Sequence, residues 1–210
     1  MADLASGRYP DTNEDWLLDG KPGQPFRSNW TRRGPLLSAG IAMTAGTGFC
    51  VPVVCQQGDV ITSITIGVKT ATNAGTIHGW AALYTGVATG AALIAQSADD
   101  TSGFHGSASA QTFTLSAPHL VGTDPGSTGT SGPVVLGVLL YNEGTTGGVL
   151  DAFGQGSEAV AGSVFVTGQV PLLFTKASMS AGATAPATLS GFAAATAGTN
   201  MAAIPFVIAH

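Results

Sequence analysis

The fold class is decided by one stretch of nine residues, Val60-Ile61-Thr62-Ser63-Ile64-Thr65-Ile66-Gly67-Val68. In an extended chain, Ile64, Ile66 and Val68 fall on one face and Thr65 falls on the other. This period of two is typical of a β-strand that has one face in a core and the other toward solvent. The stretch therefore predicts a half-buried strand of an antiparallel sheet.

Similar segments recur along the chain, each bounded by Gly, Ser, Asn or Asp. The run 134–141 is almost continuously apolar, which predicts a central strand covered on both faces. No window of useful length shows a strong helical stripe outside Ala-rich segments. We predict an all-β, antiparallel, jelly-roll-like β-sandwich with strands near residues 60–68, 77–84, 93–97, 112–115, 134–141, 149–153, 163–166, 172–175, 188–192 and 203–208.

The composition narrows the function classes. Charged residues make up 9% of the chain, against about 25% in an ordinary soluble domain, which argues against a helical bundle or coiled coil. A net charge of −5 leaves no basic footprint for a nucleic acid. The longest apolar runs are far shorter than the ~20 residues of a membrane span, and no signal peptide is visible. We expect neither a nucleic-acid partner nor membrane insertion.

The N-terminal segment differs from the rest of the chain. Residues 1–35 hold ten of the nineteen charged side chains and two of the three tryptophans, spaced by prolines. We predict an extended, irregular arm over residues 1–39 and a β-sandwich domain over residues 40–210. Large aromatic and Arg side chains anchor protein interfaces, so we expect the arm to dock onto another chain. Alternatives are a solvated tail or an arm folded back on its own domain. The expected interface residues are Trp16, Arg27, Trp30, Arg32 and Arg33.

Two constellations of polar residues were considered as chemical sites. Asp99, Asp100 and His105, with Asp124 as a fourth group, offer ligands for a divalent ion, but their spacing matches no known pattern of metal ligands. A glycosidase needs two paired carboxyl groups, and the sequence alone pairs none of its candidates. We expect loop residues, no cofactor, no metal and no enzyme activity. The carboxyl candidates are Asp99, Asp100, Asp151 and Glu158.

Two further pairs are expected to be buried. Trp80 and Tyr84 share one strand face, and we favour core packing over an exposed platform for sugars, with His78 as a hydrogen-bonded flank. Cys50 and Cys55 would fall on opposite faces if they lie on one strand; bridging them would need a turn around Pro52. We favour two reduced, buried thiols.

Four strand motifs carry a family resemblance. The chain resembles the jelly-roll-like β-sandwich modules in minor tail and fibre proteins of tailed bacteriophages, especially those infecting actinobacteria. The likeness covers roughly residues 40–145 and leaves out the arm. The motifs are His78-Gly79-Trp80-Ala81-Ala82-Leu83-Tyr84, Leu93-Ile94-Ala95-Gln96-Ser97-Ala98-Asp99-Asp100, Phe113-Thr114-Leu115-Ser116-Ala117-Pro118 and Val134-Val135-Leu136-Gly137-Val138-Leu139-Leu140.

The resemblance implies a non-enzymatic virion component that is often oligomeric and sometimes binds cell-surface glycan. We therefore expect a minor tail or fibre-type protein, located in the virion and assembled in the bacterial cytoplasm. Its expected partners are copies of itself, with a trimer as one option, and other virion proteins held through the arm. Two alternatives stay open: a capsid decoration protein, and a receptor module at the tail tip that binds a host glycan.

Overall fold

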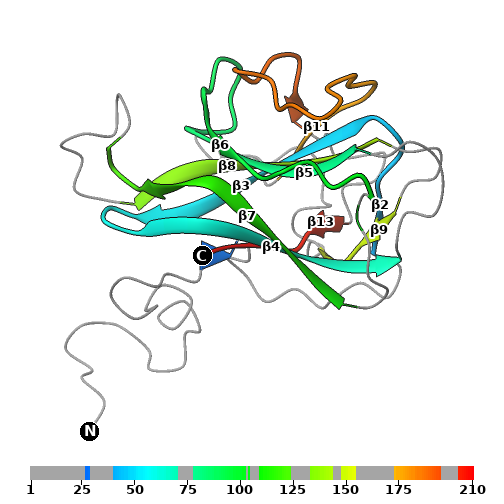
Figure 1. Cartoon of the computed structure of the whole chain (residues 1–210), viewed down its shortest axis with the longest axis horizontal. Helices are drawn as coiled ribbons and strands as arrows, with labels where there is room; N and C mark the ends of the chain where they lie inside the picture. Colours follow the sequence, from blue (N-terminus) through cyan, green and yellow to red (C-terminus); the bar gives the residue numbers. More distant parts are fainter. Residues whose placement is uncertain are drawn as a thin grey trace, which may run out of the picture.

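The computed structural model describes residues 27–28, 40–70, 78–102, 104, 109–123, 133–143, 148–154, 173–194 and 203–210. These residues contain no helix, so none of them forms an apolar helix long enough to cross a membrane. They form an all-β sandwich (Figure 1). Its strands are β1 (Arg27–Ser28), β2 (Ile41–Ala42), β3 (Thr47–Gln56), β4 (Val60–Thr70), β5 (His78–Tyr84), β6 (Leu93–Gln96), β7 (Ser109–Leu120), β8 (Pro133–Glu143), β9 (Val149–Leu150), β10 (Ala152–Gly154), β11 (Phe174–Lys176), β12 (Ala193–Ala194), β13 (Ala203–Pro205) and β14 (Val207–Ala209).

Two antiparallel sheets form the layers of the sandwich. The β4 sheet has the order β1-β14-β4-β9-β2, and β7 pairs with the other side of β4. The β8 sheet has the order β12-β11-β3-β8-β5-β6. A small ribbon of β10 and β13 accompanies them. The predicted fold class is therefore confirmed.

The strand pairs from β3 to β8 are nested. β3 pairs with β8 in one sheet, β4 with β7 in the other, and β5 with β6 again in the first. This is the pattern of one long hairpin rolled over two sheets, which is the connectivity of a jelly roll. Most of its contacts join residues that are far apart in the sequence.

The main core lies between the two sheets. On β4, Ile64, Ile66 and Val68 are buried while Thr65 is only half-buried, as the alternating pattern predicts. Facing side chains come from β3 and from one face of β8, where Leu136, Val138 and Leu140 point inward. The period-two alternation of β4 thus sets which of its faces is sealed by the other sheet.

The outer face of the β8 sheet is also buried. The segment that follows β11, residues 178–191, is here called the cover segment, and in Figure 1 it lies over β5, β6 and β8 on the side away from β4. Leu139 and Tyr141 of β8 pack under it in a second cluster of buried side chains. β8 is thus covered on both faces and lies between β3 and β5, which confirms the prediction of a central strand.

Several predicted strand bounds differ from the structure. The strand expected at 188–192 is wrong: Thr188 makes a single bridge to Ala92, and the paired strand β12 starts only at Ala193. The run 203–208 is split into β13 and β14 at Phe206. The strand expected at 163–166 lies outside the described residues.

The strand β3, with Pro52 near its centre, is not among the strands predicted from the sequence. β3 pairs with β8 along its whole length, with Pro52 opposite Gly137. On its other side, β11 pairs only with the stretch that ends at Cys50. Pro52 lies beyond that pairing, so its missing N–H interrupts no bond to β11.

The two cysteines are free thiols on opposite faces of β3, as expected for residues an odd number apart. Cys50 belongs to the cluster under the cover segment, and Cys55 belongs to the main core. Burial raises the pKa of the Cys50 thiol to about 12. This thiol is therefore protonated and unreactive at neutral pH.

Candidate functional site

The arm meets the sandwich at one described point, strand β1. Arg27 is the register partner of Ala209, and Ser28 is the partner of Ile208. These two pairs make β1 the outermost strand beside β14 in the β4 sheet. The backbone of the arm thus returns to its own domain here. The Arg27 side chain and the other predicted interface residues, Trp16, Trp30, Arg32 and Arg33, lie outside what the structure describes.

The strand that pairs with β1 is β14, which is itself paired with β4. Val207 and Ala209 are buried in the main core and are register partners of Ile66 and Ile64. His210 extends the pairing: its carbonyl oxygen accepts hydrogen bonds from the amides of Thr62 and Ser63, each at 2.8 Å. The edge that receives the arm is therefore a fixed part of the sandwich.

The His210 side chain fastens the same edge. Its Nε2 lies 2.8 Å from the Thr65 hydroxyl, which in turn lies 2.7 Å from the hydroxyl of Thr112 on β7. Burial lowers the pKa of His210, so the ring is neutral at pH 7. A neutral ring among hydroxyl groups links β4, β7 and the end of β14 without adding charge to this face.

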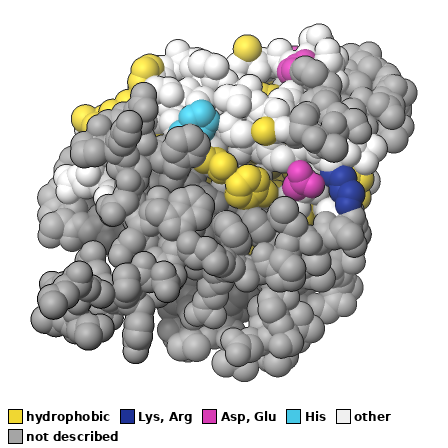
Figure 2. Space-filling model, turned by 90° about the horizontal axis from the view of Figure 1, so that it is seen from below, with side chains coloured by type: hydrophobic (Ala, Val, Ile, Leu, Met, Phe, Trp, Pro, Cys, Tyr) yellow, Lys and Arg dark blue, Asp and Glu magenta, His cyan; other side chains and the backbone are white. Residues whose placement is uncertain are grey.

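The outer face of β7 is exposed and uncharged. Thr112, Thr114 and Ser116 alternate along it with buried side chains, and β7 contains no Asp, Glu, Lys or Arg. The described atoms on the face shown in Figure 2 are mostly apolar or uncharged polar, with a few charged groups, among them an acidic and a basic side chain that lie beside each other. Such a surface is unusual for a free soluble domain, which normally intersperses both signs of charge.

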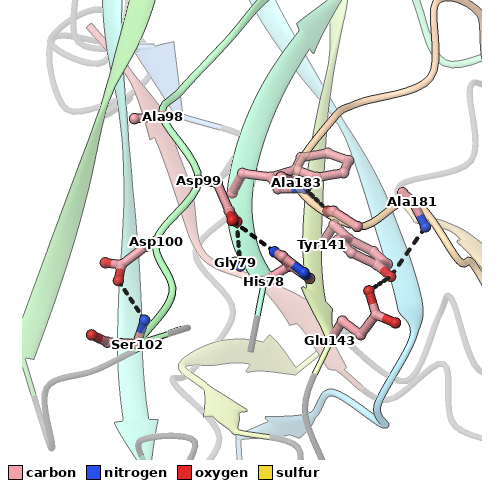
Figure 3. Close-up of polar contacts among 12 residues, drawn as sticks. His78, Gly79, Ala98, Asp99, Asp100, Ser102, Tyr141, Glu143, Ala181 and Ala183 are labelled. Atoms are coloured by element: carbon pink, nitrogen blue, oxygen red, sulfur yellow. Dashed lines mark hydrogen bonds and ion pairs between the residues drawn. The ribbon is translucent and has the colours of Figure 1, made fainter. Parts of the chain in front are cut away.

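A polar cluster lies at one end of the β8 sheet, on the outer face (Figure 3). His78 Nδ1 lies 2.7 Å from Asp99 Oδ2, and the other carboxylate oxygen of Asp99 accepts the Gly79 amide at 3.2 Å. A backbone bridge between Gly79 and Asp100 brings these residues together. The expectation that His78 is a hydrogen-bonded flank is confirmed.

Tyr141 and Glu143 form the other half of the cluster. The Tyr141 hydroxyl lies 2.7 Å from Glu143 Oε2 and accepts the amide of Ala181 at 3.2 Å. Burial, together with the bond to Glu143, raises the pKa of Tyr141 to about 12. Glu143 is also the register partner of His78 across β5 and β8. The hydroxyl therefore stays protonated and joins β8 to the cover segment.

The sequence spacing grouped Asp99 with Asp100, His105 and Asp124 and not with His78. Asp100 turns away from His78: its carboxylate accepts the Ser102 amide at 2.9 Å and the Gln111 side-chain amide at 3.3 Å. The remaining members of the proposed metal set, His105 and Asp124, lie outside the described residues. Among the residues that the structure describes, no three His, Cys, Asp or Glu side chains gather so that they could hold a metal ion.

The carboxyl groups considered for a glycosidase are not gathered either. Asp99 contacts β5 in the β8 sheet, whereas Asp151 bonds through its backbone amide to Gly67 of β4, in the other sheet. Glu158 lies outside the described residues. Of the described candidates, Asp99 and Asp151 therefore belong to different sheets.

The aromatic pair is buried under the cover segment. Trp80 and Tyr84 have no exposed surface. The Trp80 indole N–H donates to the Gly182 carbonyl at 2.8 Å, and the Tyr84 hydroxyl donates to the Pro186 carbonyl at 2.7 Å. The expectation of core packing is confirmed, and this face of β5 offers no exposed aromatic platform.

Replacing Asp99 with alanine tests the structural role of the cluster. The change removes the partner of His78 and leaves the Gly79 amide without its side-chain acceptor, so we expect a loss of about 1–2 kcal/mol in the free energy of unfolding. Asn at the same position keeps an acceptor and should lose less. Urea denaturation of both variants measures the difference; equal stability of wild type and Asp99→Ala would contradict this assignment.

No protein-family model matches the sequence of this chain, and no curated protein sequence matches it either.

Proposed function

We propose that the chain is a non-enzymatic structural component of a bacteriophage particle, a minor tail or fibre-type protein anchored by its N-terminal arm. The proposal is supported by the resemblance of its strand motifs to phage tail modules and by the jelly-roll-like sandwich that contains those motifs. Its partners are further copies of the chain and other virion proteins. The observation that carries the proposal is the near absence of charge on the sandwich.

The described sandwich has few charged side chains, and they are distributed unevenly over its surface. Over residues 40–210 its bases are Lys69 and Lys176, and its described acids are Asp59, Asp99, Asp100, Glu143 and Asp151. The exposed outer face of β7 has none of them. A surface packed against protein neighbours needs fewer charges for solubility than a surface that faces water. Assembly also hides sheet edges that would otherwise pair at random.

The polar cluster supports a structural role in the same way. His78 bonds to Asp99, and Tyr141 bonds to Glu143 and to the cover segment, so these groups are engaged with one another. Such bonds position strands and loops. Tyr141 is fully buried, so its hydroxyl holds β8 to the cover segment and does not face solvent.

Deletion of residues 1–35 tests the proposal. We expect the truncated sandwich to fold but to be missing from purified particles, as measured by immunoblot against the full-length protein. The matched control is deletion of residues 1–26, which removes the preceding part of the arm and keeps β1. Circular dichroism of both proteins checks that the sandwich is intact.

The outcomes separate the alternatives. Loss of incorporation supports an arm-anchored structural protein, and antibody labelling in electron micrographs then distinguishes tail from capsid. Normal incorporation with lost adsorption to cells favours the receptor module. Normal incorporation together with normal adsorption contradicts the proposal.

A further inference from the structure

The edge strand β14 is the place where the sandwich accepts an added strand. One side of β14 is paired with β4, and the other side receives β1. Strand addition at an edge is held mainly by backbone hydrogen bonds, so the same seat accepts the same segment from any copy of the chain. β1 makes only two register pairs there, Arg27 with Ala209 and Ser28 with Ile208.

The far side of the same sheet is less open. β7 is the strand on that side, and a bridge between Ser97 and Leu115 links it to the end of β6 in the other sheet. This bridge ties the middle of β7 to the other sheet. The β14 edge differs because its outer neighbour comes from a segment that precedes the whole sandwich in the chain.

The connection between β1 and the sandwich is long enough to reach a second molecule. Eleven residues separate Ser28 from Gly40, and a chain of that length spans up to roughly 40 Å when extended. The radius of gyration expected for a compact domain the size of residues 40–210 is about 16 Å. A connection of this length is sufficient for β1 to pair with the edge of an adjacent copy.

We propose that in the assembled protein β1 of one copy pairs with β14 of a neighbouring copy, in the register that the structure shows within one chain. This inference rests on the proposed function, because it needs copies held side by side. The backbone bonds are identical in both arrangements, so exchange of the strand adds little unfavourable energy. Which arrangement dominates depends on the local concentration of neighbouring edges compared with the effective concentration that the connection provides, on the order of mM.

Strand exchange also gives the arm its role as an anchor. β1 lies between residues 1–26 and the sandwich, so pairing with a neighbour carries the charge-rich segment onto that neighbour. The acceptor is the β14 edge, which His210 fastens to β4. The structure thus assigns both halves of the contact: the strand from one copy and the edge from the next.

A cysteine cross-link between two different chains tests the exchange. Full-length Ser28→Cys with one affinity tag and full-length Ile208→Cys with another are co-produced, concentrated to about 1 mM and oxidised. The two positions are register partners, and opposite Cβ atoms of an antiparallel pair come close enough for a disulfide. We expect a disulfide-linked heterodimer that carries both tags on a non-reducing gel.

Three controls make the result specific. Ser28→Cys mixed with Thr114→Cys places the second thiol on the exposed face of β7, away from the acceptor edge, and should give no heterodimer. Each single variant alone accounts for linkage through the native thiols, which are buried. The double variant Ser28→Cys, Ile208→Cys reports pairing within one chain as a monomer of altered mobility.

The proposal is overturned if the mixture gives no more heterodimer than the Thr114→Cys control, whether or not the double variant closes within one chain. This result is independent of the deletion experiment. A truncated protein that fails to enter particles while no heterodimer forms would keep the structural function and remove strand exchange. If a heterodimer forms while the truncated protein enters particles normally, strand exchange is supported and the arm-anchored structural function is contradicted.

Discussion

Replacing Trp80 with alanine is expected to lower the free energy of unfolding by about 4 kcal/mol. Trp80 is among the largest fully buried side chains, and its ring packs against Tyr141 with centroids 4.9 Å apart. The change removes this contact and the indole bond to Gly182, and it leaves a cavity between β5 and the cover segment. For a domain of this size the melting temperature should fall by about 10 °C.

Two further variants separate packing from the hydrogen bond. Trp80→Phe keeps an aromatic ring and loses the bond to the Gly182 carbonyl, so it should lose clearly less stability than alanine. Thr114→Ala on the exposed face of β7 should change stability by no more than about 0.5 kcal/mol. Urea unfolding followed by circular dichroism measures all three. A loss below about 1 kcal/mol for Trp80→Ala would mean that the cover segment does not pack on Trp80.

Replacing Gly137 with alanine is expected to destabilise the protein by about 2–3 kcal/mol, although Ala is ordinarily preferred to Gly inside a strand. Gly137 lies on the central strand β8, and a Cβ atom there would overlap the backbone carbonyl of Gly86. It would also come within 3.2 Å of the Cys50 sulfur. The overlapping atom is a backbone carbonyl of the loop between β5 and β6 and not the end of a flexible side chain, so the loop or β8 must shift.

The matched control is Gly86, the other residue of this contact. A Cβ atom added at Gly86 would meet nothing within 4 Å, so Gly86→Ala should be neutral or slightly stabilising. Thermal unfolding of Gly137→Ala and Gly86→Ala measures the difference in stability between the two variants. If both substitutions have the same small effect, the close approach of β8 to the Gly86 carbonyl is not present in solution.

Local patterns predicted the parts of the fold that depend on alternation alone. The faces of β4, the double burial of β8 and the opposite placement of Cys50 and Cys55 all follow from the two-residue period of a strand. The shared, buried face of Trp80 and Tyr84 follows in the same way. These features need no knowledge of which strands are neighbours.

The features that depend on pairing could not be predicted. His78 and Asp99 are 21 residues apart and are brought together where Gly79 bridges to Asp100, so sequence spacing did not group Asp99 with His78. β3, which contains Pro52, was not among the predicted strands. Pro52 is tolerated there since β11 ends before it.

The cover segment misled the sequence analysis for a different reason. Its small residues give neither a period of two nor one of 3.6, and the stretch expected as a strand at 188–192 has only two large apolar side chains, Leu189 and Phe192. Its place is set by side chains of the sheet beneath it, which bond to its backbone. Composition carries no signal for such a contact.

This form of attachment has a consequence for how the protein changes over evolutionary time. Three side chains of the sheet hydrogen-bond to the backbone of the cover segment. Trp80 bonds to Gly182 and Tyr84 bonds to Pro186. Gln96 bonds to Ala183 and Ala185. Every amino acid supplies a backbone carbonyl, so exposed positions such as Ala183 and Thr184 can be substituted without loss of these hydrogen bonds. The side chains of the sheet that form the bonds cannot. The surface of this layer can thus diversify rapidly above an unchanging scaffold.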